Sequence, residues 1–133
     1  MKITTAMRAH RILKAMKNYE NLEAKNDELK AIFKTVSLGE SLGYYKNSDA
    51  LGDAVGIFDK GLAWDDKGEF ISLLFRDIVE VILPDEKKSE ALILKTHDGI
   101  QFELPIKGHN ERFYDSLEML RFLRRVMKDV KSN

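Results

Sequence analysis

The three histidines of this sequence are the side chains best suited to metal binding or to proton transfer near neutral pH. His10, His97 and His109 each stand alone, without a second ligand at the spacing of a zinc site. His97 lies beside a predicted turn and His109 just before a predicted helix, where an exposed loop position is the simpler interpretation. We therefore predict neither a histidine-bound metal nor a histidine-based catalytic site.

Acidic and glycine-rich segments supply the other candidate chemistry. Asp65, Asp66 and Glu69 offer oxygen ligands for a cation, but acids do not recur at the alternate positions that an EF-hand loop requires. The segment 52–56, Gly-Asp-Ala-Val-Gly, lacks the Gly-Lys-Ser/Thr ending of a phosphate-binding loop. The chain has no cysteine, which excludes thiolate ligands, thiol nucleophiles and disulfides. We expect no metal, no cofactor and no enzymatic activity.

The composition is that of one soluble globular domain. The chain has 133 residues, of which 44% are hydrophobic and 33% charged. Its 22 basic and 22 acidic residues give a net charge of zero, which provides no overall attraction to nucleic acid. No apolar run is long enough to cross a bilayer, and the N-terminus lacks the pattern of a secretory signal. We expect a soluble cytoplasmic protein that does not bind nucleic acid.

The charges are unevenly distributed along the chain. Residues 1–19 carry five basic residues and no acid, and residues 20–106 carry 10 basic and 18 acidic residues. Residues 107–133 carry 7 basic and 4 acidic residues. An acidic middle thus lies between two basic ends, and its simplest consequence is that the ends are attracted to the middle within the fold.

A first helix is predicted at the N-terminus, capped by Thr4 or Thr5. Apolar residues recur along it at helical spacing: Ile12, Leu13, Met16 and Tyr19. Basic residues on another strip form a candidate surface for a protein partner or an anionic membrane: Arg8, Arg11, Lys14 and Lys17. The alternative, which we favour, is that this helix packs on the domain with its charges facing the acidic middle.

A second helical segment is predicted from about residue 20 to residue 35. Its apolar stripe is a candidate interface for a second copy of the chain or for another protein: Leu22, Leu29, Ile32 and Phe33. A polar run at residues 23–28 interrupts the stripe. The two N-terminal segments are therefore either separate helices or one bent helix, and intramolecular packing explains the stripe equally well.

From Gly39 onward the pattern changes to strands and turns. Five glycines within residues 39–61 interrupt any helix, and short strands are predicted near residues 42–45 and at 54–58. Clearer strands are predicted where branched and aromatic residues lie between turn signals, at 61–64, 69–75, 78–83, 91–96 and 100–106.

The last third of the chain has the clearest local pattern, a hairpin followed by a helix. Asp98-Gly99 predicts a type I′ turn, and Pro105 predicts that the second hairpin strand ends at a sheet edge. Asn110 is a suitable N-cap for the helix. The helix carries a continuous apolar stripe: Phe113, Leu117, Leu120, Leu123, Met127 and Val130. Met119, Phe122 and Val126 widen it, and a stripe this wide must be buried. We expect it to cover a sheet or the mouth of a barrel.

Three segments within residues 56–130 share a pattern with a known fold. In the first, residues 61–70, Trp64 precedes a polar turn. The second is Leu-Phe-Arg-Asp-Ile-Val-Glu-Val at 74–81, and the third is the hairpin at 92–104 with its following helix. Together they resemble a pleckstrin-homology-like (PH-like) domain, especially its GRAM-like and bacterial members. The resemblance implies an α+β fold, a bent antiparallel β-sandwich or partly open barrel capped by the C-terminal helix. One or two N-terminal helices precede it here.

These patterns predict a helical extension at residues 1–38 and a PH-like domain at residues 39–133. The predicted function is a non-catalytic interaction or scaffold module, whose N-terminal helices mediate self-association or protein binding. Peripheral binding to an anionic membrane through the basic first helix is the first alternative. A small ligand carrier or enzyme, with a site that sequence spacing does not reveal, is the second.

Overall fold

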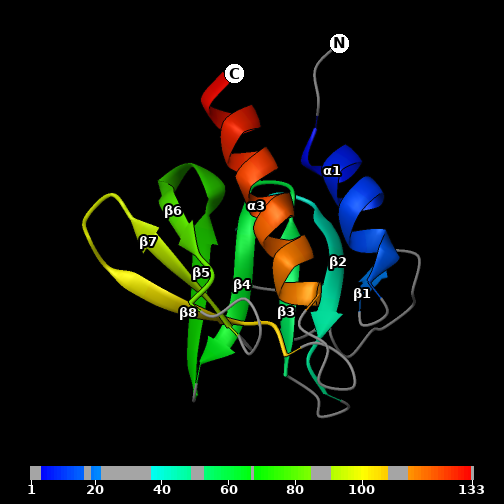
Figure 1. Ribbon diagram of the computed structural model, residues 1–133, viewed down its shortest axis with the longest axis horizontal. Coiled ribbons are helices and arrows are strands. Elements are labelled where there is room, and N and C mark those ends of the chain that lie inside the picture. The colour runs from blue at the N-terminus through cyan, green and yellow to red at the C-terminus, as the bar shows by residue number, and fades with distance from the viewer. Residues whose placement is uncertain are drawn as a thin grey trace.

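The protein is an α+β structure with two antiparallel sheets, a short N-terminal helix and a longer C-terminal helix (Figure 1). The helices are α1 (Thr5–Ile12), which continues into a 3-10 turn at Leu13–Ala15, and α3 (Tyr114–Ser132). The computed structural model describes residues 4–16, 19–21, 37–48, 53–66, 68–84, 91–107 and 114–132. The predicted fold class is confirmed at this level, and the described strands form two open sheets without a closed barrel.

The first sheet has five strands in the order β1-β2-β3-β4-β5. Their bounds are β1 (Tyr19–Asn21), β2 (Ser41–Lys46), β3 (Ala54–Phe58), β4 (Gly61–Asp66) and β5 (Glu69–Leu74). Strands β2 and β3 lie in the glycine-rich segment, and β3 has the bounds that the sequence predicts. All five residues of β3 are buried, so this sheet is covered on both faces at its centre.

The second sheet has three strands in the order β6-β7-β8. They are β6 (Ile78–Ile82), β7 (Ala91–Thr96) and β8 (Gln101–Pro105), and a 3-10 turn at Phe75–Asp77 leads into them from β5. Pro105 pairs with Ala91 at the end of an edge strand, as predicted. A proline is tolerated there because its missing N–H removes no hydrogen bond from the sheet interior.

The turn between β7 and β8 differs from the predicted type I′ turn. The Gly99 N–H donates to the Thr96 carbonyl at 3.0 Å, and the Thr96 N–H donates to the Ile100 carbonyl at 3.0 Å. The loop therefore contains three residues, His97, Asp98 and Gly99, of which Gly99 has a φ of +82°. The prediction of a hairpin is confirmed and its two-residue turn is wrong. A three-residue loop also requires a glycine in the left-handed region, so Asp-Gly is compatible with both lengths.

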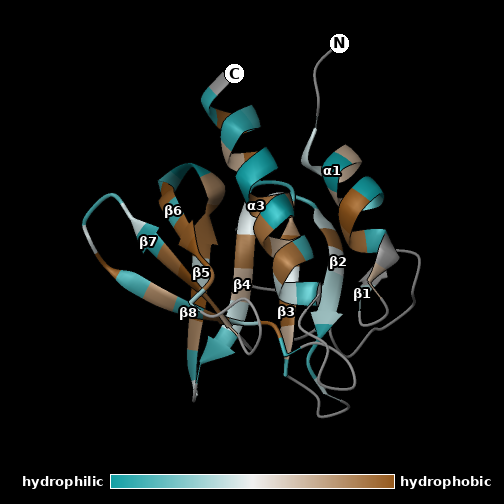
Figure 2. Ribbon diagram, in the orientation of Figure 1, coloured by the Kyte–Doolittle hydropathy of each residue, from teal (hydrophilic) through white to brown (hydrophobic). Residues whose placement is uncertain are grey.

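One main core lies between the sheets and the helices. Its fully buried side chains come from both sheets, the intervening turn and both helices: Leu13, Tyr45, Trp64, Phe75, Leu94 and Phe122. The rings of Phe75 and Phe122 meet edge to face, with their centroids 6.1 Å apart. Figure 2 shows α3 as an amphipathic helix, with hydrophobic residues along one side and hydrophilic residues along the other. Burial of this apolar face is the largest favourable contribution available to hold α3 in place.

Most of the predicted apolar face of α3 is buried. Leu120, Leu123 and Met127 of the stripe are buried, as are Met119, Phe122 and Val126 beside it, whereas Leu117 is 40% exposed. The predicted burial of Leu117 is therefore wrong. The apolar face of α3 is wider than the surface that contacts the core. The contact of Phe122 with Phe75 orients the helix and so decides which apolar residues are buried. The predicted cap Asn110 lies outside the described residues.

The N-terminal segment belongs to the same core as the sheets. Thr4 caps α1 as predicted, because its side-chain oxygen accepts the Met7 N–H at 3.2 Å. Ala9, Ile12, Leu13 and Met16 are buried together with residues of both sheets. The described part of residues 1–38 thus packs on the domain, while the proposed division at residue 38 stays a prediction.

Tyr19 is in a strand, so its predicted place on a helical stripe is wrong. It pairs with Tyr45 of β2, and its hydroxyl donates to the Leu42 carbonyl at 3.2 Å. Burial raises the pKa of Tyr19 to about 12, which keeps this donor protonated. The predicted start of a second helix near residue 20 is wrong for the same reason, since β1 extends to Asn21. Sheet pairing, a contact distant in sequence, overrides the local helical spacing.

No helix in the described residues is long and apolar enough to span a membrane.

Replacement of Leu13 by Ala tests whether the N-terminal segment is part of the core. Leu13 is completely buried, so Leu13→Ala is expected to lower the free energy of unfolding by about 2–5 kcal/mol. The exposed neighbour Lys14 supplies the control, because Lys14→Ala is expected to change the free energy of unfolding by less than about 0.5 kcal/mol. Urea denaturation measures both. Equal effects of the two substitutions would show that this segment does not contribute to the core.

Candidate functional site

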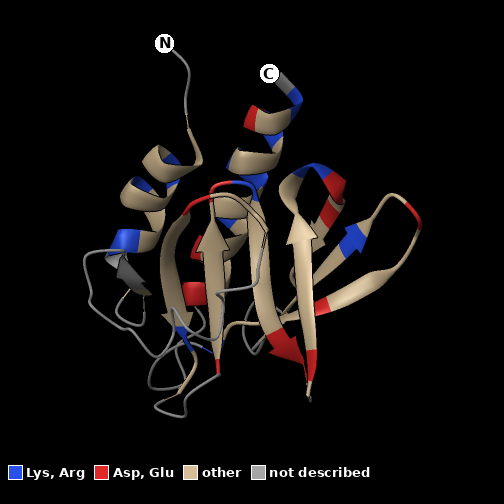
Figure 3. Ribbon diagram, turned by 180° about the vertical axis from the view of Figure 1, so that it is seen from behind, with Lys and Arg blue, Asp and Glu red and all other residues tan. Residues whose placement is uncertain are grey.

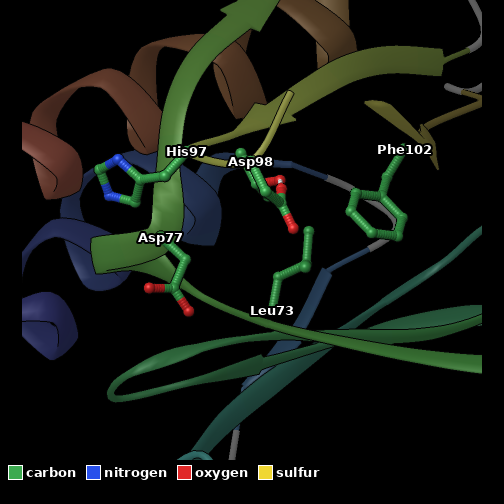
Figure 4. Close-up of a pocket in the computed structure, with 6 residues that line it drawn as sticks. Leu73, Asp77, His97, Asp98 and Phe102 are labelled. Atoms are coloured by element: carbon green, nitrogen blue, oxygen red, sulfur yellow. Dashed lines mark hydrogen bonds between the residues drawn. The ribbon is translucent and has the colours of Figure 1, made fainter. Parts of the chain in front are cut away.

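A half-open hollow of 290 Å³ lies between the end of β5, the 3-10 turn and the β7–β8 hairpin (Figure 4). Its described lining consists of two carboxylates, an imidazole, a hydroxyl and two apolar side chains: Leu73, Asp77, Thr96, His97, Asp98 and Phe102. The chain brings them together because β5 turns directly into β6 while the hairpin tip returns to the same corner. We take this hollow as the candidate site, because its described lining combines apolar side chains with polar groups.

Hydrogen bonds fix the hairpin tip to the 3-10 turn. The His97 N–H donates to the Asp77 carbonyl at 3.2 Å, and His97 Nε2 lies 3.0 Å from the Arg76 carbonyl oxygen. A carbonyl oxygen only accepts, so Nε2 carries the hydrogen in this contact. His97 is exposed, as predicted, but its ring serves to position the hairpin. The hollow is therefore bounded by elements that are connected to each other.

Asp98 is held as a carboxylate at the rim of the hollow. The Thr96 hydroxyl makes a short hydrogen bond to its Oδ1, and the Ile100 N–H donates to the same oxygen at 3.4 Å. These donors, the Thr96 hydroxyl first, lower the pKa of Asp98. Hydrogen bonds to the charged form favour ionisation. A negative charge is thus fixed on one side of the hollow, and Asp77 supplies a second carboxyl group on another.

The remaining walls are apolar. Figure 4 shows Leu73 and Phe102 beside the Asp98 carboxyl group, and both are half-buried. An aliphatic stem fits against Leu73, while a cation next to an aromatic ring and a carboxylate is attracted by both. The arrangement is therefore suited to a cationic group on an apolar stem, such as the side chain of arginine or lysine.

Arg8 is the first of the predicted surface residues, and the structure assigns it an internal contact. Its guanidinium makes two hydrogen bonds to Asp129 of α3, from Nε at 2.9 Å and from the terminal nitrogen at 3.1 Å. The two side chains are only 15% and 17% exposed. The prediction that this charge faces the acidic middle is wrong, because its partner lies in the basic C-terminal region. Helix packing, which sequence charge does not encode, brings α1 beside α3.

The other predicted surface residues are divided between exposed and undescribed positions. Arg11 and Lys14 are exposed. Lys17 and the four predicted interface residues, Leu22, Leu29, Ile32 and Phe33, lie outside the described residues. That interface therefore stays a prediction.

The predictions about metal ligands concern acidic residues and histidines. The described residues contain no group of three or more metal-binding side chains. Asp65, Asp66 and Glu69 lie where β4 and β5 meet, with Asp66 paired to Glu69 in the ladder. Asp53 makes an ion pair with Lys107 at 3.5 Å. His10 is exposed on α1, and His109 lies outside the described residues.

The segment around Ser41 matches a short sequence motif of hydrolases. Residues 39–43 read Gly-Glu-Ser-Leu-Gly, which has the letters of the nucleophile elbow of α/β-hydrolases. That motif requires the serine on a sharp turn from strand to helix, whereas Ser41 is the first residue of β2. Its hydroxyl lies 3.3 Å from the Tyr44 hydroxyl. The local structure therefore argues against a nucleophilic Ser41.

Comparison with known proteins does not assign a family to this chain. No protein-family model matches it, and no match is found among curated proteins.

The Arg8–Asp129 pair predicts a pH-dependent contribution to stability. The hydrogen bonds from Arg8 lower the pKa of Asp129 below its unfolded value. The stabilisation is therefore present above about pH 4 and is lost as pH falls through the lowered pKa of the folded state. A double-mutant cycle with Arg8→Ala and Asp129→Ala is expected to give a coupling energy of about 1 kcal/mol at neutral pH. Thermal denaturation at several pH values measures it. A coupling that is unchanged at pH 2 would contradict an ionic interaction.

Proposed function

We propose that this protein is a non-catalytic PH-like interaction module, which binds a basic side chain of a partner protein in the hollow beside the β7–β8 hairpin. The observation that carries the proposal is the combination of Asp77, Asp98 and Phe102 around one half-open space. The two carboxyl groups supply attraction for a cation, and the aromatic ring supplies a surface for it to stack on.

The PH-like assignment is supported by the order and packing of the elements. Sheets of five and three antiparallel strands are followed by a C-terminal helix whose apolar face lies on the core. The sequence resemblance rests on three segments: residues 61–70 of β4 and β5, residues 74–81 leading into β6, and the hairpin of β7 and β8 with α3. The short α1 and β1 are additions that join the core and the sheet edge.

A binding role is favoured over a catalytic one by the chemistry of the hollow. Thr96 is the hydroxyl-bearing residue of its described lining, and its oxygen already contacts Asp98 and the Ile100 carbonyl. The Nε2–H of His97 donates to the Arg76 carbonyl, which leaves Nδ1 as the proton-accepting nitrogen of this ring. A nucleophilic Thr96 would need a base as its partner, but its hydroxyl donates to Asp98 and not to His97. The hollow is better suited to holding a charge than to moving a proton.

Binding of a basic side chain can be tested by NMR titration of the full chain. The probe is a capped Gly-Arg-Gly tripeptide, and capped Gly-Gln-Gly is its uncharged control. The arginine peptide is expected to cause saturable shifts of the backbone amides of the residues that line the hollow: Leu73, Asp77, Thr96, His97, Asp98 and Phe102. Asp77→Asn removes one of the two carboxyl groups and is expected to raise the dissociation constant by about fivefold, the effect of losing one exposed charge contact.

The matched control is Asp65→Asn, since Asp65 is an exposed acid on β4 outside the lining of the hollow. It removes the same charge and is expected to leave the dissociation constant unchanged. The proposal fails if the glutamine peptide causes the same shifts, or if Asp65→Asn weakens binding as much as Asp77→Asn.

A further inference from the structure

The solvent face of α3 is strongly basic. Five basic residues of this helix are exposed: Arg121, Arg124, Arg125, Lys128 and Lys131. Spacings of four and three residues place Arg121, Arg125 and Lys128 on one stripe along the helix. The apolar face of α3 is occupied by the core, so this stripe is what the helix offers to solvent.

The described acids of α3 are already engaged. Asp115 accepts the Tyr45 hydroxyl at 2.5 Å, and Glu118 lies 3.6 Å from Arg121. Asp129 accepts both hydrogen bonds from Arg8. Positive charge therefore exceeds negative charge over the solvent face of the helix, although the whole chain has no net charge.

Helix α1 extends this basic surface. Figure 1 shows α1 and α3 side by side and running in opposite directions. One helical turn from the Arg8–Asp129 contact is Arg11 on α1 and Arg125 on α3, so helix geometry puts these two residues at about the same level. Both are exposed. We name the surface formed by Arg11, Arg121, Arg125 and Lys128 the basic band. Figure 3 shows a contrast with the sheet ends: acidic residues lie at the junction of β4 and β5, and the hairpin tip carries the acidic Asp98.

A shallow hollow adjoins the band on α1. It has a volume of 490 Å³, and its described lining consists of Ala6, Met7, His10 and Arg11. Arg11 thus belongs to both the band and the hollow, and Met7 provides a flexible apolar surface one helical turn away. A ligand that combines carboxylates with an apolar side chain would match this arrangement.

We propose that the basic band binds an acidic, partly apolar segment of a partner protein, at a surface separate from the hollow beside the hairpin. Arginine carries most of the charge, and its planar group forms paired hydrogen bonds with carboxylates. Methionine and arginine together are typical of protein interfaces. The described side chains of α1 and α3 expose no aromatic ring for stacking on nucleic-acid bases. Leu117 is their one large exposed apolar residue, which is little to anchor a helix in a bilayer.

The test uses the full chain and a fluorescein-labelled helical peptide of repeated Glu-Glu-Leu units. Fluorescence anisotropy is expected to show saturable binding that weakens as salt is raised. The double variant Arg11→Glu/Arg125→Glu is expected to raise the dissociation constant by at least about tenfold, because it reverses both charges beside the helix pair. Circular dichroism checks that the variant folds. If the double charge reversal does not fold, Arg11→Gln/Arg125→Gln is used in its place, and it is expected to raise the dissociation constant by about threefold.

The matched control makes the same change in net charge elsewhere. Lys60→Glu/Lys95→Glu alters the β3–β4 turn and β7, and it is expected to change the dissociation constant by no more than about twofold. Equal weakening by the two pairs would overturn the proposal, because net charge alone would then explain binding. The proposal is also overturned if the peptide does not bind the wild-type chain. Binding of phosphatidylserine vesicles or of single-stranded RNA by a chain that does not bind the peptide would show that the basic band has a different ligand.

Discussion

The packing of α3 on the core is the interaction on which the rest of the structure depends. Met119, Phe122 and Val126 are completely buried, and Phe122 meets Phe75 at the turn that joins the two sheets. This contact fixes the corner from which β6 starts, and the hairpin tip is tied to the same turn through His97. It also fixes α1, whose Arg8 bonds to the outer flank of α3. The apolar faces of α1 and α3 are buried in the core, so a partner that binds these two helices must be recognised mainly through charge.

Two surfaces of opposite charge follow from this arrangement. The hollow beside the hairpin contains Asp77 and Asp98, while the basic band lies on the helix layer. A chain with no net charge can in this way attract partners of both signs, provided that each surface is rigid enough to keep its charges together. The hydrogen bonds of the hairpin tip and the Arg8–Asp129 pair supply that rigidity. Together, the two proposed sites describe a scaffold that contacts more than one partner.

The sequence was most informative where local and tertiary preferences agree. The alternation around Asp98-Gly99 and the two strands in the glycine-rich segment have counterparts in β7, β8, β2 and β3. It was least informative where a distant contact decides. Tyr19 has helical spacing but pairs with Tyr45, Leu117 lies on an apolar stripe but faces solvent, and Arg8 binds an acid in the basic end of the chain. The hollow could not be predicted because β5 and the hairpin are brought together only by the fold. Leu73 and Phe102 are far apart in sequence and carry no motif.

The central claim, that α1 and α3 close one core shared with both sheets, is tested most directly by native-state hydrogen exchange. The Leu13 N–H, which donates to the Ala9 carbonyl at the end of α1, reports on this helix. Its opening free energy is expected to match that of amides in β3 and α3, with the same dependence on denaturant, because one cooperative unit opens together. Exchange of Leu13 through a local opening, at a free energy well below that of β3, would contradict the account.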